Sequence, residues 1–373
     1  MPEYSTNRYN KITAYFLGFI SFVLFVYILM ALSEILIPVT IAIFLTYLFH
    51  PLLMYFRKIK IPKWLSVIII LIIVGGLYYL LGFILIASLS NFPEKLEAYS
   101  HNLSGFLYTI LKPFNITVHE FADFLNLQIQ EFEIDSLFKS LFEAGVIQNI
   151  FNSFSGILGD IFIALIFWIF MILGKEKFER RLKLAFKDKR ETVDKNLDSI
   201  DHQLQSYIII KTILSFITGA IATLILMLYG IDFAIVWGLL TFFLNYIPNI
   251  GSLIATIAPI LVSLLEYGFG FTTISLSALL LINQNIIGNL IEPHYLGRQM
   301  DLSPVFVLFS LIFWGSVWGI VGMFLAVPIA AAMKILFSNI EPLKPLAIIM
   351  GSKVVSDEDL KRPEKRVEKS DES

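Results

Sequence analysis

Apolar residues in this chain form one run after another that is long enough to cross a lipid bilayer. The first three runs cover residues 12–33, 36–56 and 64–90. A helix needs about 20 consecutive apolar residues to span the hydrocarbon core of a membrane. A soluble domain cannot cover so many such segments, because its surface does not shrink without limit. We therefore expect a protein that crosses the bilayer several times, with lipid as one of its partners.

Composition agrees with this expectation and narrows the chemistry. The chain is 57% hydrophobic and 16% charged, whereas soluble domains average about 45–50% and about 25%. It contains no cysteine, which excludes thiolate metal sites and cysteine nucleophiles. The sequence also has no phosphate-binding glycine string, no cluster with metal-ligand spacing and no nucleophile beside a base. We therefore expect no enzyme activity, no cofactor, no metal site and no nucleic-acid partner.

The later apolar runs differ from the first ones because several of them are interrupted. The first run exceeds the about 7–15 apolar residues of a signal peptide, so we expect it to remain as a membrane helix. The whole set predicts an all-α fold with about eight transmembrane segments. In this fold the blocks 233–267 and 304–337 form broken helices or hairpins that are either re-entrant or full spans. The runs beyond the third cover residues 154–174, 207–229, 233–267, 271–296 and 304–337.

The distribution of charge predicts the orientation. Short loops rich in Lys and Arg stay cytoplasmic, and Lys175–Arg190 carries eight basic against three acidic residues. Residues 91–153 carry eight acidic residues and three lysines, with apolar residues at helical spacing. We expect both termini in the cytoplasm and a small helical insertion outside. The predicted divisions are 1–90 for the first three helices, 91–153 for the insertion, 154–340 for a C-terminal membrane region with broken helices, and 341–373 for a disordered cytoplasmic tail.

Polar side chains near the end of the membrane region form the first candidate site. Asn285, Asn289 and Glu292 are spaced i, i+4 and i+7, so a helix places them on one face, with Asn283 and Gln284 beside it. Amides and a carboxylate are costly in hydrocarbon, so this face must meet protein or a water-lined cavity. Hydrogen bonding between helices and a substrate pathway both fit the pattern.

Breaks in the backbone give two further candidate sites. Residues 245–251 (NYIPNIG) place proline and glycine inside an apolar block, which leaves backbone groups without helical partners. Transporters place binding sites at such breaks, although a tight cytoplasmic turn has the same sequence pattern. Residues 314–328 (WGSVWGIVGMFLAVP) hold three glycines and a proline that suit either close helix packing or a hairpin. Lys211, near the start of the fifth span, is expected to extend its side chain to the cytoplasmic surface.

Four segments of the chain, taken in order, resemble the autoinducer-2 exporter family of bacterial and archaeal membrane proteins. They are LIPVTIAIFLTYLFHPLL in the second span, the insertion after the third span, NYIPNIGSLIATIAPILVSLL, and the C-terminal NLIEPHYLGRQMDLSPVFVLFSLIFWGSVWGIVGMFLAVPIAAAM. The resemblance covers about residues 12–340. Asn249 follows Pro248 where the family usually has a bulkier or aromatic residue, which leaves the substrate preference open.

The resemblance implies a multi-pass transporter of the cell membrane, because some members export autoinducer-2 and others exchange sodium or lithium for protons. It also implies a homo-oligomer, such as a pentamer, with mobile hairpins. We expect a secondary transporter of a small polar solute. The alternatives are a monovalent cation/proton antiporter with Glu292 as the exchangeable carboxylate and, in another class, a non-transporting scaffold or passive channel. Carried onto this chain, the expected substrate-binding residues are Asn245, Pro248, Asn249, Gly251, Asn285, Asn289, Glu292, Pro293, Gly322 and Pro328.

Overall fold

The fold is helical throughout the part of the chain that the structure describes, which confirms the predicted all-α class. The structure is a computed structural model, and it describes residues 3–90, 95, 99, 102, 105–106, 108, 111–114, 146–185, 190–296, 301–338 and 340–352. Apart from helices, these residues contain one isolated bridge between Leu302 and Gly351. Seven segments among them are long and apolar enough to cross a membrane, which agrees with a polytopic helical membrane protein.

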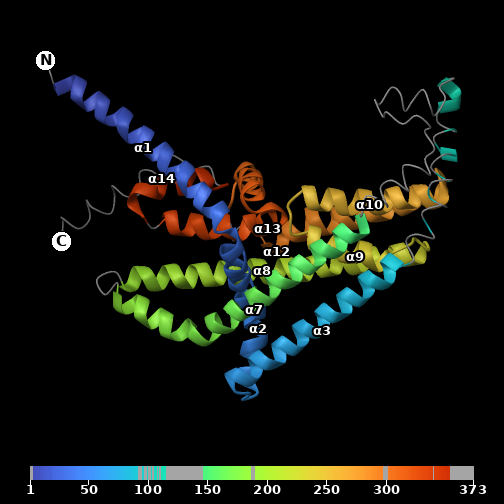
Figure 1. The fold of residues 1–373 in the computed structure, drawn as a ribbon, viewed down its shortest axis with the longest axis horizontal. Coiled ribbons are helices and arrows are strands. Elements are labelled where there is room, and N and C mark those ends of the chain that lie inside the picture. The colour runs from blue at the N-terminus through green and yellow to red at the C-terminus, as the bar shows by residue number, and fades with distance from the viewer. Residues whose placement is uncertain are drawn as a thin grey trace, which may run out of the picture. The chain divides into compact units, whose positions relative to one another are not determined.

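Most helices follow the predicted runs (Figure 1). The predicted fourth span, 154–174, lies in a 40-residue helix, of which the side chains before residue 159 are outside the described set. In chain order the elements are α1 (Glu3–Ala31), α2 (Ser33–Lys58), α3 (Lys63–Ser90), η1 (Lys112–Phe114), α7 (Val146–Ala185), α8 (Arg190–Leu228), α9 (Ala234–Leu244), α10 (Ile250–Tyr267), α11 (Phe271–Asn285), η3 (Ile286–Ile291), α12 (Glu292–Leu296), α13 (Pro304–Ser338), η4 (Glu341–Leu343) and α14 (Lys344–Met350).

The chain forms two compact units, which are described separately. Unit 1 comprises Met1–Tyr47, Ile163–Gln205 and Arg298–Ser373, and unit 2 comprises Leu48–Phe162 and Ser206–Gly297. The units therefore interleave along the sequence. The four divisions predicted from the sequence are consecutive ranges defined by the membrane segments, not compact units. They remain predictions.

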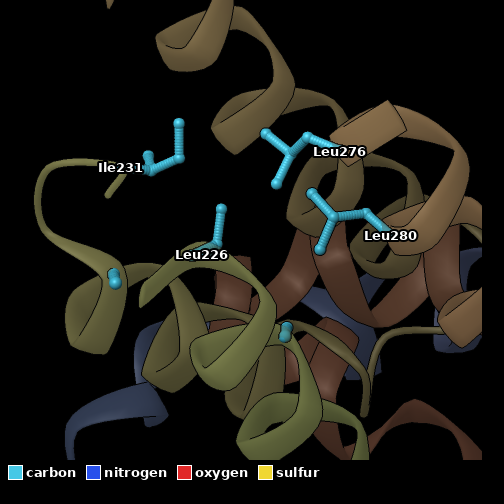
Figure 2. Packing of buried hydrophobic residues seen from close by; sticks show 6 residues of the cluster. Leu226, Ile231, Leu276 and Leu280 are labelled. Carbon is cyan, nitrogen blue, oxygen red and sulfur yellow. The ribbon is translucent and has the colours of Figure 1, made fainter. Parts of the chain in front are cut away.

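Helix α8, whose second part belongs to unit 2, ends in a glycine C-cap, and the residues beside this cap lie in the apolar core of the unit. Gly230 has a positive φ of 70°, and its N–H donates to the Met227 carbonyl, while the Ile231 N–H donates to the Leu226 carbonyl at 2.9 Å. This is the Schellman arrangement, in which the residues flanking the turn also make an apolar contact. Figure 2 shows Leu226 and Ile231 converging with Leu276 and Leu280 of α11. The cap thus directs the chain back toward α9 and fixes the packing of α8 against α11.

Helix α9 returns along α8 at very short range. A Cβ atom on Gly238 would lie 1.7 Å from the Thr223 Oγ1 and 2.8 Å from the Gly219 carbonyl oxygen, so only glycine fits there. Small residues let membrane helices approach closely in this way. Helix α9 has 11 residues and is therefore about 16 Å long. It is too short to cross a hydrocarbon core of about 30 Å, so the following break favours a re-entrant arm over two full spans.

Helix α13 of unit 1 is a helical hairpin, one of the arrangements that its sequence predicts. Trp318 and Gly319 have non-helical backbone angles, with φ of 62° and ψ of −142° at Gly319, a region that essentially only glycine adopts. The two arms run antiparallel, because Ser310 Oγ donates to the Ala326 carbonyl at 3.0 Å. At the tip, Trp318 Nε1 donates to the Leu29 carbonyl of α1 at 3.0 Å, which attaches the hairpin to the first helix.

The segment after this hairpin, at the start of the predicted cytoplasmic tail, is helical. Residues 341–350 form η4 and α14. Lys334 near the end of α13 pairs with the Asp301 carboxylate at 2.8 Å, and Ser352 Oγ donates to the same carboxylate at 2.7 Å. These contacts tie the start of the tail to the base of the hairpin, so its helix has tertiary partners that a sequence profile does not reveal. Residues 353–373 lie outside the described residues.

Within unit 2, a polar clasp joins the predicted insertion to Asp232, just before α9, and to Glu266 near the end of α10. Lys95, Tyr99 and Asn102 are spaced i, i+4 and i+7, so they share one helical face. Lys95 pairs with Asp232 at 3.1 Å, and the Tyr99 hydroxyl lies 3.0 Å from the Asp232 carboxylate and 3.1 Å from that of Glu266. Burial and the charge of Glu266 raise the pKa of the Tyr99 phenol above its ordinary value. The phenol therefore remains a hydrogen-bond donor at neutral and alkaline pH. The apolar repeats predicted at 137–142 lie outside the described residues.

Replacing Tyr99 by Phe is expected to loosen this clasp. A hydrogen bond to a charged group contributes about 1.5–3 kcal/mol, so its loss should raise the open population of the insertion by roughly 10-fold or more. The rate of limited proteolysis within residues 91–153 measures that population. Tyr108→Phe is the matched control, because Tyr108 is 60% exposed. Equal cleavage rates for Tyr99→Phe and the control would contradict the clasp.

Candidate functional site

Three elements of unit 2 bring polar side chains together inside the protein. They are the middle of α8, the break between α9 and α10, and the region where α11 passes through η3 into α12. Hydrogen bonds join Asn245 to Ser215 and Gln284, and Tyr246 to Thr212, while one ion pair joins Lys211 to Glu292. We call this group the polar cluster. It consists of Lys211, Thr212, Ser215, Asn245, Tyr246, Asn283, Gln284 and Glu292.

Helix α8 contributes a buried polar stripe. Lys211, Ser215 and Thr218 are spaced i, i+4 and i+7, and they are 4%, 0% and 0% exposed. Residues at this spacing occupy one face of a helix. The Thr218 carbonyl accepts a hydrogen bond of 3.1 Å from the Asn283 amide of α11, which links the two helices. The stripe therefore gives α8 a polar inner face in an otherwise apolar span.

The break between α9 and α10 supplies the centre of the cluster. Asn245 follows directly on α9 and is 4% exposed; its amide donates to Ser215 Oγ at 3.1 Å and its oxygen accepts from the Gln284 amide at 3.3 Å. The next residue, Tyr246, donates its hydroxyl proton to Thr212 Oγ1 at 2.6 Å. Asn245 thus bridges α8 and α11, and the end of α9 is held level with this turn of α8.

Glu292 enters the cluster through a change of helix type. η3 is a π-helix, and the Glu292 N–H bonds to the Ile287 carbonyl, five residues earlier. In an α-helix Ile291 would follow Ile287 on the buried face, but the wider turn brings Glu292 to that position. Pro293 gives a physical reason, because it lacks an N–H and its ring crowds the carbonyl four residues before it. The π-helix therefore aims a carboxylate at the interior.

Lys211 and Glu292 form a buried ion pair. The Lys211 ammonium lies 2.5 Å from a carboxylate oxygen of Glu292, and the side chains are 5% and 18% exposed. The expectation that Lys211 reaches the cytoplasmic surface is therefore wrong. A buried lysine is stable only beside a partner, and here the partner comes from a segment 81 residues away.

The structure separates the predicted polar face into two. Asn289 donates to the Asn285 oxygen at 2.8 Å, so these two do share a face, but both are exposed in the single chain. The π-helix rotates Glu292 away from them toward the buried side. Gln284, predicted only as a flanking residue, lies in the polar cluster instead. Pro293 is exposed in the first turn of α12.

The other residues predicted at the first break have mainly backbone roles. Pro248 is half-buried and interrupts the helix. Asn249 is exposed, with φ of 60° and ψ of −54°, and the Ile250 N–H donates to the Pro248 carbonyl across it at 2.6 Å. Gly251 is buried, and a Cβ there would lie 1.8 Å from the Leu244 carbonyl oxygen. Close return of the chain onto α9 therefore requires this glycine.

Gly322 and Pro328 belong to unit 1 and lie in the second arm of the α13 hairpin. Both are buried. A Cβ on Gly322 would lie 1.9 Å from the Trp314 carbonyl oxygen, so the glycine permits contact between the two arms. Pro328 lies two residues after Ala326, whose carbonyl accepts the hydrogen bond from Ser310. Close packing of the two arms within unit 1 is therefore a sufficient reason for a glycine at position 322.

Sequence reasoning missed the contribution of α8. Thr212, Ser215 and Tyr246 were not among the predicted residues. The spacing of Lys211, Ser215 and Thr218 was a usable signal, because three polar residues on one face of a membrane helix cannot all face lipid. The partner of that face could not be read from the spacing alone.

The chemistry available in the cluster is hydrogen bonding with a balanced charge. Hydroxyl and amide groups surround one carboxylate and one ammonium, which compensate each other. Among the residues that the structure describes, no group of His, Cys, Asp or Glu is arranged to hold a metal ion. Hydroxyl and amide groups of this kind can hydrogen bond to a small polar molecule.

Known proteins that resemble this chain are transport proteins. The model of the AI-2E family transporter matches residues 19–341. The AI-2 transport protein TqsA of Escherichia coli is 30% identical over 328 residues, which cover 86% of this chain and 90% of that protein. A Haemophilus influenzae protein whose name assigns it only to transport is 28% identical over 86% of this chain and 90% of its own length. YrrI of Bacillus subtilis, also named only for transport, is 26% identical, with coverages of 82% and 87%.

Proposed function

Because the chain belongs to the AI-2E transporter family, we propose that it is a secondary transporter that exports a small polar solute of the autoinducer-2 kind. The proposal depends on one observation, the buried polar cluster beside a broken helix. Transporters bind their substrates where membrane helices are interrupted, because backbone and side-chain groups are free to hydrogen bond there. The solute would contact Asn245, Ser215 and Gln284, which already form a connected set of donors and acceptors.

The balanced charge of the cluster favours a neutral solute. An anion would have to displace Glu292 from Lys211, and a cation would have to displace Lys211 from Glu292. Either exchange would leave a charge unpaired in a low-dielectric interior, which costs several kcal/mol. A polyhydroxylated neutral molecule could instead exchange hydrogen bonds with the amides at little net cost.

Flux measurements in proteoliposomes test this function. Vesicles with the purified wild-type protein should accumulate synthetic autoinducer-2, and Gln284→Leu should reduce the initial rate about 10-fold, because one buried hydrogen bond contributes about 1 kcal/mol or somewhat more. Asn289→Leu is the matched control from the same polar segment, since Asn289 is exposed. Equal rates for the wild type and Gln284→Leu would remove the cluster from the pathway. A lower rate for Asn289→Leu alone would assign the pathway to the predicted Asn285–Asn289 face.

Monovalent cation/proton exchange is the second candidate, since Glu292 is a partly buried carboxylate. Proton flux driven by a sodium gradient, without solute, would support it over solute export. The predicted cytoplasmic location of both termini and the homo-oligomer remain proposals. Labelling of single cysteines introduced into the cysteine-free chain tests the first, and the mass of the detergent-solubilised complex tests the second.

A further inference from the structure

Lys211 of α8 lies beside the C-terminal end of α9, where the chain is broken before α10. The hydrogen bonds from Tyr246 to Thr212 and from Asn245 to Ser215 fix the end of α9 beside this turn of α8. Lys211 immediately precedes Thr212, so its backbone lies level with the break. The ammonium is buried, and its partner Glu292 reaches the same level through the π-helix.

The polar cluster that contains this ammonium holds groups of the kind that bind cations. The C-terminal end of a helix has a partial negative charge from its unpaired carbonyls. Broken membrane helices use such ends to hold Na⁺ or H⁺. In this chain the carbonyls of Thr241, Phe243 and Leu244 at the end of α9 accept backbone hydrogen bonds, so the full negative charge beside Lys211 comes from the Glu292 carboxylate. The neutral oxygens of Thr212, Ser215 and Asn245 in the same cluster are of the kind that hard cations accept as ligands.

The lysine neutralises the site without any bound ion. The Lys211 ammonium lies 2.5 Å from Glu292 and is the better buried of the two groups. If an uncharged residue of similar size and shape replaced Lys211, the negative charge of the Glu292 carboxylate would have no positive partner, because the rest of the polar cluster is uncharged. A free monovalent cation could then replace the ammonium, in competition with protonation of the carboxylate.

We infer that the Lys211 ammonium is a tethered replacement for a coupling cation, so that the broken-helix site of this transporter requires no external Na⁺ or Li⁺. This inference rests on the proposed transport function. Two consequences follow. Solute transport does not depend on a sodium gradient acting at this site, and removal of the lysine creates a sodium-binding site in its place.

The test measures ion-dependent stability, which needs no solute and no flux. Purified wild-type protein, Lys211→Met and Lys211→Met/Glu292→Gln are unfolded thermally in NaCl, LiCl or choline chloride at equal ionic strength. The wild type should unfold at one temperature in all three salts. Lys211→Met should gain about 4 °C in NaCl or LiCl with a saturable dependence on concentration. The double variant, which lacks the carboxylate, should show no such gain.

Three outcomes would overturn the inference. The first is a folded Lys211→Met protein that unfolds at the same temperature in all salts. The second is a saturable sodium effect on the wild type, which would instead support cation exchange at Glu292. The third is failure of both Lys211→Met and Lys211→Ala to fold at any sodium concentration, because a bound ion should restore the charge balance. Absence of autoinducer-2 flux in the wild type would refute the solute and leave the ion measurements unaffected.

Discussion

Glu292→Gln is expected to lower the midpoint of thermal unfolding in detergent by about 10 °C. The substitution preserves shape but leaves the Lys211 ammonium, 5% exposed, without its partner. Removing one member of a buried ion pair costs about 3–5 kcal/mol, because the remaining charge is neither solvated nor compensated. For a protein of this size each kcal/mol corresponds to about 2–4 °C. The loss should therefore be far larger than for an exposed pair.

A double-mutant cycle separates charge from shape in this prediction. Lys211→Met/Glu292→Gln removes both charges and should unfold within a few degrees of the wild type, since replacing a whole buried pair is often neutral. Glu341→Gln is the matched control, because Glu341 pairs with Lys344 on the surface and is 84% exposed. It should change the midpoint little. A double variant as unstable as Glu292→Gln would show that packing, rather than charge, explains the loss.

The breaks in the helices could be predicted from the sequence because they are encoded locally. Pro248 and Gly251 interrupt α9 and α10, and Gly319 turns the α13 hairpin, where its positive φ requires glycine. The long apolar runs are local signals as well, since length and hydropathy alone decide whether a helix can span lipid. These features depend on neighbours in the sequence and not on the tertiary structure.

The arrangement of the candidate site could not be predicted in the same way. The spacing of Asn285, Asn289 and Glu292 assumes 3.6 residues per turn, and the π-helix Ile286–Ile291 changes that number within the segment. The burial of Lys211 depends on a carboxylate that lies 81 residues away. The π-helix has a local cause in Pro293, whereas the burial of Lys211 depends on packing against a distant segment. A pattern that assumes an unbroken α-helix shows neither effect.

Gly322→Ala is expected to destabilise the α13 hairpin by about 3 kcal/mol, at the upper end of what overpacking costs. The added Cβ would lie 1.9 Å from the Trp314 carbonyl oxygen and 2.6 Å from its carbon. These are backbone atoms of the opposite arm, which cannot rotate away as a side chain can. The arms must therefore separate, and the hydrogen bond from Ser310 to the Ala326 carbonyl should weaken. The measurement is thermal unfolding, with an expected drop of about 6–12 °C.

Gly18→Ala in α1 is the control, because nothing lies within 4 Å of a Cβ at that position. It should leave the midpoint unchanged or raise it slightly, since alanine favours helix over glycine by up to about 1 kcal/mol. An unchanged midpoint for Gly322→Ala would mean that the arms do not pack as closely as the structure places them. The flux per folded molecule then decides the role of this glycine. A variant that is unstable but transports normally when folded would assign Gly322 to packing, whereas a stable variant without flux would assign it to the solute pathway, as the family resemblance predicts.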